Sequence, residues 1–355
     1  MANMTLGSIL NTDDGYLFVQ NLNTNQSTVD GDFASIKRTC EKRRMGCEYL
    51  NSTQLRMRYP TFSFPHECVG IFHRQSDYIN VNALMKALLR ILSRKSNVII
   101  RQQEEFLSLK LNNQTQIVTN RGALFSRKVL FTVGPYAKNM SRLLNFDLNI
   151  TLWELPIFYF RLLPNATQFP TWLAWDGNDR QSLFFGYPKI SISSNYVIIS
   201  PRFIRNLSTP LIYLSQQTNK IDDFLTQKVI EWVSHNMATQ VNISDYYVST
   251  QTCLATFLPD NEFLLDYVPQ TNERVLMQAA GWSMKFVPIW GDIISDMILL
   301  DEAMNTSSKY AQYMEYFSFF RPNRLIDDIT IPNKGFQNVS IWFLTLVLSF
   351  HIIFF

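Results

Sequence analysis

The stretch CLATFLPDNEFLLDYVP, residues 253–269, places a lone cysteine shortly before an acidic turn. The previous cysteine, Cys68, is far away in the sequence. A thiol in this position could be an apolar filler of the core, half of a disulfide, or a covalent attachment point. Cys40 and Cys47 could pair with each other, which would leave Cys68 and Cys253 over. The local sequence keeps all three roles of Cys253 open.

The other titratable residues point away from two kinds of function. The four histidines are scattered and lack the spacing of metal ligands, so no metal site is predicted. Asp260 and Asp266 are interpreted as a turn residue and a strand cap rather than as catalysts. A net charge of +3 and a pI near 8.6 are too mild for a nucleic-acid-binding protein. The chemistry therefore centres on Cys253 and on the elements that position it.

Apolar periodicity predicts helices and strands along the chain. Helices are expected at residues 30–45, 51–59, 81–93, 135–144, 222–237 and 287–300. The helix at 81–93 is expected to bury an apolar face that contains Leu84, Leu88, Ile91 and Leu92. Strands are expected at residues 15–22, 97–102, 106–111, 116–120, 127–134, 153–163, 182–187, 195–199 and 274–279. The apolar run at 127–134 ends in glycine and is typical of a central strand in a sheet covered on both faces.

The segment after Cys253 also contains many residues in a distinctive order. These are Cys253, Thr256, Pro259, Asp260, Phe263, Asp266, Pro269, Gly281, Ser283, Lys285 and Gly291. The order resembles the C-terminal flavin-binding segment of the monomeric sarcosine oxidase and peroxisomal sarcosine/pipecolate oxidase family. Further similar segments are 70–88, 129–140, the run Phe185-GYP, and 317–324. The resemblance covers roughly residues 14–325.

The alternation of elements and the resemblance together imply the fold. We expect an α/β (α+β) protein with two interleaved domains. One is an FAD-binding three-layer domain, N-terminally truncated, and the other is a substrate domain built on a mostly antiparallel sheet. The implied division is 1–64 and 149–252 for the substrate domain, 65–148 and 253–330 for the FAD-binding domain, and 331–355 for a linker and hydrophobic tail.

The resemblance also implies a cofactor and a reaction. Cys253 corresponds to the cysteine that bonds to the 8α-methyl group of FAD. Lys285 corresponds to a lysine that contacts the substrate carboxylate and the flavin edge, and Arg202 or Arg205 could supply a cation for oxygen activation. The implied cofactor-binding residues are Cys253, Gly134, Pro135, Gly281, Ser283 and Lys285. The implied reaction oxidises a secondary amino acid of the sarcosine or pipecolate type to an imine and reduces O2 to H2O2.

Three differences from the family support an alternative function. The sequence contains no G-x-G-x-x-G, so the N-terminal unit that binds the FAD pyrophosphate is predicted to be missing. GWSMK is three residues shorter than the family's GFSGHGFK, and Ala255 replaces an aromatic residue. The alternative is a catalytically inactive, truncated family member that acts as a membrane-associated binding or structural glycoprotein. A truncated gene product is a third interpretation.

Two features bear on localisation. Eleven Asn-x-Ser/Thr triplets occur, whereas 28 Asn and 52 Ser plus Thr predict about 4 by chance, which favours the secretory pathway. The last 15 residues carry no formal charge apart from the titratable His351. They could anchor the chain or be a removable tail, although a spanning helix needs ~20 residues. The N-terminus has no features of a signal peptide. The family resemblance gives the peroxisome as the alternative, but the chain has no C-terminal SKL-type signal.

Overall fold

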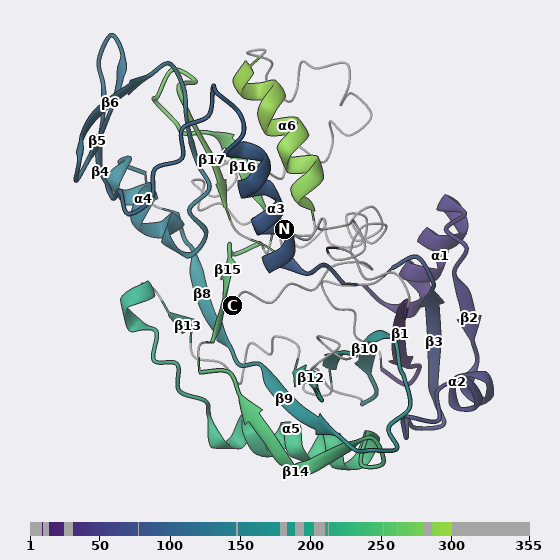
Figure 1. The fold of residues 1–355 in the computed structure, drawn as a ribbon. Coiled ribbons are helices and arrows are strands. Elements are labelled where there is room, and N and C mark those ends of the chain that lie inside the picture. Colours follow the sequence, from purple (N-terminus) through teal and green to yellow (C-terminus); the bar gives the residue numbers. More distant parts are fainter. Residues whose placement is uncertain are drawn as a thin grey trace.

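The computed structural model of the protein describes residues 9, 14–24, 31–76, 78–146, 148–177, 183–188, 195–201, 210–211, 213–250, 252–260, 262–279, 281 and 286–299. Within these residues the strands form four sheets, with helices packed beside them (Figure 1). This arrangement confirms the predicted mixture of α and β structure. The largest sheet and two of the smaller sheets, which contain β5 and β17, occupy opposite ends of the molecule, and β8 and β15 of the remaining sheet run between them (Figure 1).

The largest sheet has eight strands and is mostly antiparallel, as the sequence predicts for residues after 152. Only β1 and β10 pair in parallel. The strands, in spatial order, are β14 (Val241–Val248), β9 (Phe158–Leu162), β12 (Tyr196–Pro201), β11 (Leu183–Tyr187), β10 (Thr171–Trp175), β1 (Tyr16–Asn21), β3 (Cys68–His73) and β2 (Glu48–Leu50).

The two faces of this sheet carry different apolar clusters because side chains alternate along each strand. In β9, Phe158 and Phe160 lie in one cluster, together with Trp232 of α5 (Asp223–Asn236). Tyr159 points to the opposite face and joins a tyrosine-rich cluster. Trp172 of β10 stacks on Trp232 with ring centroids 5.1 Å apart, so it belongs to the core on the α5 side.

Two short helices form within the predicted ranges 30–45 and 51–59. In α1 (Phe33–Arg43) the N-cap residue Asp32 accepts a hydrogen bond of 2.7 Å from the backbone N–H of Ser35. In α2 (Ser52–Arg58) the N-cap residue Asn51 accepts one of 2.9 Å from Gln54. A disulfide joins Cys40 in α1 to Cys47 just before β2, which confirms that these two cysteines pair.

A second sheet, of three strands, belongs to the region that resembles the flavin domain. Its central strand is β17 (Val275–Ala279), with β16 (Leu264–Tyr267) antiparallel on one side and β7 (Val129–Phe131) parallel on the other. The predicted central position of β7 is therefore wrong within the described residues, where it is an outer strand. The prediction that both faces of the strand are covered is confirmed, because Phe131 and Leu130 enter apolar clusters on opposite faces of the sheet.

Helices and a meander complete this region. A 3-10 turn, η2 (Gly134–Tyr136), follows β7 and leads into α4 (Ala137–Leu143). The predicted helix at 287–300 is α6 (Val287–Leu299), whose Trp290 packs on Phe263. The predicted meander is the sheet of β4 (Phe106–Leu111), β5 (Thr115–Thr119) and β6 (Gly122–Ser126).

The structure corrects two predictions between residues 81 and 102. The helix exists as α3 (Val81–Leu92), but the face predicted to be buried is open: Leu88, Ile91 and Leu92 are 39%, 55% and 40% exposed. Only its first turn is buried, because no described element covers the rest of this face. The strand predicted at 97–102 does not form, and Ile99 is 80% exposed. The apolar periodicity thus predicts the helix correctly, whereas the burial of its apolar face depends on whether another element packs against it.

A third sheet joins the two ends of the molecule. It consists of β13 (Pro210–Leu211), β8 (Thr151–Leu155) and β15 (Cys253–Phe257). The division into domains stays a prediction; its boundary at residue 64 falls between β2 and β3, which are neighbours in the eight-stranded sheet. The predicted tail at 331–355 lies outside the described residues. Among the described residues, no helix combines the length and the apolar character needed to cross a membrane.

Candidate active site

Cys253 is the first residue of β15, the strand that runs from the large sheet into the joining sheet (Figure 1). In the large sheet β9 pairs with β14, ending at Phe158 opposite Val248. The same two chain segments then pair again as β8 and β15, with Cys253 opposite Leu155. A hydrogen bond of 2.9 Å from the backbone N–H of Ser249 to the carbonyl of Ile157 holds the bend between the two sheets. Cys253 is thus the first residue of its strand after a change of sheet.

The thiol of Cys253 has apolar neighbours on its face of β15. Ala255 and Phe257 share that face by alternation, and Ala255 lies opposite Trp153 of β8. Cys253 forms no disulfide and is half-buried. Burial raises the pKa of the Cys253 thiol, because an apolar environment disfavours the thiolate. The free side chain is therefore a protonated thiol at neutral pH.

A polar network fixes the chain just before this thiol. The carboxylate of Glu154 accepts hydrogen bonds from the backbone N–H groups of Thr218 and Asn219, at 3.0 and 2.9 Å. It also accepts one of 3.0 Å from the hydroxyl of Thr252, the residue before Cys253. Asn219 in turn accepts from the backbone N–H of Thr252. The sequence gives no signal for this network, because its members are distant from one another in the chain.

The predicted residues Gly134 and Pro135 lie in η2, which packs against β15. Gly134 has φ +51°, a left-handed conformation that favours glycine. A Cβ atom at this position would meet no atom within 4 Å, so the turn leaves open space beside it. The structure therefore brings Gly134 and Pro135 to the strand that carries Cys253.

Gly281 joins the same group of elements. Its backbone N–H donates a hydrogen bond of 2.8 Å to the carbonyl of Thr256 in β15. It has φ +66°, and a Cβ atom there would lie 2.5 Å from the ring of Phe263. Four of the predicted cofactor residues, Cys253, Gly134, Pro135 and Gly281, thus lie on or against one strand. The other predicted site residues, Ser283, Lys285 and Arg205, lie outside the described residues.

A buried aromatic cluster lies on the large sheet near the same bend. Ile157 belongs to the cluster of Tyr159, Tyr187 and Ile198, on the face of the sheet opposite α5. Tyr159 stacks on Tyr247 at 4.5 Å between ring centroids. Prediction from sequence recorded only that this region is aromatic and alternates. The alternation of Phe158, Tyr159 and Phe160 was the signal that Tyr159 faces away from its neighbours.

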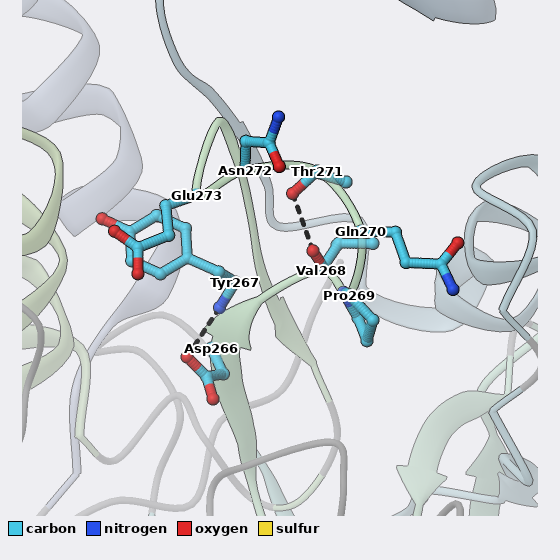
Figure 2. A pocket seen from close by; sticks show the side chains of 8 residues that line it. All are labelled: Asp266, Tyr267, Val268, Pro269, Gln270, Thr271, Asn272 and Glu273. Atoms are coloured by element: carbon cyan, nitrogen blue, oxygen red, sulfur yellow. Dashed lines mark hydrogen bonds between the residues drawn. The ribbon is translucent and has the colours of Figure 1, made fainter.

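A hollow described in the structure lies elsewhere. It has a volume of about 340 Å³ and is lined only by residues 266–273, the turn between β16 and β17 (Figure 2). Figure 2 shows that the lining comes from this one turn, with hydrogen bonds inside it from Thr271 to Val268 and from Tyr267 to Asp266. A hollow inside one turn has no second wall to enclose a ligand.

The residues around β15 fit one end of FAD. The attachment of a flavin ring needs a free thiol; Cys253 is free and half-buried, and η2, with open space at Gly134, packs against the same strand. The described residues of the predicted site therefore fit the ring end of the cofactor. The sequence contains no G-x-G-x-x-G, the loop that would hold the pyrophosphate at a helix N-terminus.

Comparison with known proteins identifies the family of the chain. The family model described as "FAD dependent oxidoreductase" matches residues 8–297. A Dictyostelium discoideum protein named for bifunctional amine oxidase activity is 24% identical over 73% of this chain and 25% of its own length. A Caenorhabditis elegans protein named for sarcosine oxidase is 22% identical over 70% of this chain and 65% of its own length. The chain thus spans less than two thirds of either relative. An N-methyl-L-tryptophan oxidase of Yersinia pestis is 25% identical over 78% of the chain and 70% of its own length.

Solved structures show the same fold. NikD, described as an unusual amino acid oxidase essential for nikkomycin biosynthesis, superposes with a TM-score of 0.69 at 23% identity. That match covers 82% of this chain and 74% of NikD. Glycine oxidase from Geobacillus kaustophilus superposes with a TM-score of 0.60 at 12% identity, over 83% of this chain and 73% of the oxidase. Because the family model matches well over half of the chain, this protein belongs to the family of FAD-dependent oxidoreductases.

Proposed function

We propose that the protein is an amine oxidase that acts on a secondary amino acid of the sarcosine or pipecolate type. The substrate would become an imine, and O2 would become H2O2. The names of the C. elegans and Yersinia relatives, which refer to N-methylated amino acids, support this substrate class. One observation carries the proposal: β15, which begins with Cys253, is contacted by both η2 and Gly281, and all three lie within the region matched by the family model.

Each part of the site has a proposed role. Cys253 would hold the flavin through its sulfur, and the turns at Gly134 and Gly281 would let the backbone approach the ring closely. When bound, the flavin supplies the chemistry of accepting two electrons from the substrate and passing them to O2. Lys285 is proposed to bind the substrate carboxylate, and Arg205 to supply a cation near the oxygen site.

The aromatic cluster supports an amine substrate. Tyr159 and Tyr187 lie on the face of the large sheet opposite α5, beside the bend that leads to Cys253. Aromatic faces attract ammonium groups and N-methyl groups, with energies of about 0.5–2 kcal/mol per contact. Tyr159 and Tyr187 are buried, so the ring proposed to meet the substrate nitrogen is the exposed Tyr247, which stacks on Tyr159. This ring would orient the nitrogen without adding a charge.

The decisive experiment uses protein isolated from its source organism. Native protein is precipitated with acid, and flavin fluorescence is measured in the pellet and in the supernatant. Recombinant Cys253→Ala, with Cys68→Ala as the control at the other free cysteine, is treated in the same way. We expect flavin in the pellet for wild type and Cys68→Ala but not for Cys253→Ala, and peroxide release with sarcosine or pipecolate. Colourless native protein that releases no peroxide with either amino acid would refute the proposal.

The second candidate is a catalytically inactive, membrane-associated binding or structural glycoprotein. It is favoured by the segment GWSMK, which is three residues shorter than the family's GFSGHGFK. The packing of Ala255 against Trp153, where the family has an aromatic residue, supports it as well. This candidate predicts folded native protein without flavin that sediments with membranes. The flavin measurement therefore separates the two candidates.

A further inference from the structure

We infer that this protein is N-glycosylated on the outward-facing asparagines of its Asn-x-Ser/Thr triplets, in an oxidising secretory compartment. The inference concerns modification sites and is independent of catalysis, so it holds for an oxidase and for an inactive protein alike. It rests on the side chains of the triplets, on one disulfide, and on the positions of the sites in the sheets.

Every triplet asparagine that the structure describes is exposed. The six are Asn51, Asn113, Asn139, Asn149, Asn165 and Asn242. Their neighbours show that the exposure follows from the fold. Asn149 lies between the buried residues Leu148 and Ile150, and Asn139 lies on α4 between buried Lys138 and Met140. Each of these asparagine side chains therefore points to solvent, and a large glycan there would displace no core residue.

The amide nitrogens of these six side chains are also free. Asn51 and Asn242 use only the side-chain oxygen, which accepts from Gln54 and Ser244. None of the six donates a hydrogen bond through Nδ2 within the described structure. The two buried asparagines of the described region behave differently, because Asn21 and Asn236 both donate through Nδ2 to Asp176. Neither of those two belongs to a triplet, so every described triplet remains compatible with a sugar on Nδ2.

The disulfide supplies independent evidence for the compartment. The bond between Cys40 and Cys47 joins the last turn of α1 to the residue before β2. Structural disulfides persist in oxidising compartments and are rare where glutathione keeps thiols reduced. Its formation removes two electrons and two protons from the thiols, and a disulfide-exchange oxidant of the secretory pathway accepts them. The compartment that supplies this oxidant is the one in which N-glycans are added.

Two of the sites lie at the outer strands of the eight-stranded sheet. Asn242 is in β14 at one edge, and Asn51 directly follows β2 at the other. Outer strands present unpaired backbone groups that can pair with another molecule. A glycan beside each of these strands would hinder such edge-to-edge pairing. The glycans would thus keep the large sheet from associating with other copies.

The chemical step is a transfer to the amide nitrogen. A bond forms between Nδ2 of asparagine and C1 of the first sugar, while the bond from C1 to a lipid-linked pyrophosphate breaks. The amide loses one proton to solvent, and no electron is transferred. The co-reactant is a lipid-pyrophosphate-linked oligosaccharide, which acts on the chain before it folds. Buried hydroxyls such as that of Thr115, in the triplet of Asn113, are therefore accessible when the sugar is added.

The test uses native protein from the source organism. Peptide N-glycosidase in heavy-oxygen water converts each glycosylated asparagine to a heavy-labelled aspartate, which peptide mass spectrometry locates. We expect the label at the six described sites, and Cys40 and Cys47 recovered as a disulfide-linked pair. Unmodified asparagine at all six sites, or free thiols at Cys40 and Cys47 after trapping at acid pH, would overturn the inference.

Single variants of the full-length transcript in eukaryotic cells provide the site-specific control. Ser244→Ala keeps Asn242 but destroys its triplet, and it should remove one glycan, seen as one step on a gel. Asn51→Gln should remove one glycan as well. Asn82→Gln changes an exposed asparagine outside any triplet and should leave the mobility unchanged. Equal mobility of all three variants and wild type would also contradict the inference.

Discussion

The turn at Gly281 permits a sharp test of the site's architecture. Gly281→Ala adds one methyl group to a residue with φ +66°, and this Cβ would lie 2.5 Å from Cε1 of Phe263. The left-handed backbone costs a non-glycine residue ~1–2 kcal/mol. Phe263 cannot move away at low cost, because its ring packs against Phe286 and Trp290 at 5.2 and 5.4 Å. Overpacking of this kind adds about 1–3 kcal/mol, so the total destabilisation is about 2–5 kcal/mol.

Gly134→Ala is the matched control. Gly134 also has a left-handed backbone, at φ +51°, but an added Cβ would meet nothing within 4 Å. This variant therefore carries only the backbone cost of ~1–2 kcal/mol. Thermal unfolding followed by circular dichroism should show a larger fall in the midpoint for Gly281→Ala than for Gly134→Ala. The excess measures the contact with Phe263.

A double-mutant cycle separates this reasoning from general fragility. Once Phe263→Ala has removed the ring, Gly281→Ala should cost only the backbone term, a coupling of about 1–3 kcal/mol. If Gly281→Ala and Gly134→Ala destabilise equally, or if the cycle shows no coupling, the turn at Gly281 does not press on Phe263 as the structure places it. Such a result would also contradict the position of Gly281 that its hydrogen bond to Thr256 requires.

Three further predictions concern the cysteines. Burial raises the pKa of Cys253, so in flavin-free protein its alkylation by iodoacetamide should need a higher pH than alkylation of a cysteine in a short peptide. Glu154→Ala removes the hydrogen bond to Thr252 and should speed the alkylation of Cys253 at a fixed pH. An unchanged rate would count against a role of the Glu154 network in ordering the chain before this thiol. Burial raises the pKa of Cys68 from 9.0 to about 12, so the unfolded chain loses this proton before the folded chain does. The contribution of the buried thiol to stability is therefore full below pH 9 and is lost as the pH rises to about 12. Cys68→Ala should flatten this alkaline decline in the unfolding midpoint, and an equally steep decline would refute the assignment. Cys47→Ser should lower the free energy of unfolding by about 2 kcal/mol, because the short loop closed with Cys40 is no longer constrained, and reductant should reproduce the loss in wild type.

Local sequence predicted most of the secondary structure because the signals are themselves local. The capping residue Asn51 bonds to a backbone group three residues further on, so it marks where α2 begins. Asp32 caps α1 in the same way, although the sequence predicts that this helix begins at residue 30. The pairing of Cys40 with Cys47 could be anticipated for the same reason. By contrast, the parallel pairing of β1 with β10 joins residues far apart in the chain, and no local pattern announces it.

The errors share one physical origin. The apolar face of α3 and the apolar residues at 97–102 read as buried, because a sequence shows hydrophobicity but not the surface that would cover it. The position of β7 was misjudged for a related reason. A run of apolar residues reports that both faces of a strand are covered, as Leu130 and Phe131 show, and not how many strands lie beside it.

The same distinction explains how the candidate site could be located from sequence. Its main contacts lie within one short stretch of chain: Gly281 bonds to Thr256 in β15 and presses on Phe263, the residue before β16. The order of residues in that stretch therefore encodes its geometry, which is why resemblance found Cys253 and Gly281. Glu154 was missed, because it reaches Thr252 from another strand and orders the chain around a thiol that it does not touch. In such a site, the residues within one short stretch of chain can be recognised from the sequence. The residues that adjust the reactivity of the thiol from another strand can be identified only when the pairing of the strands is known.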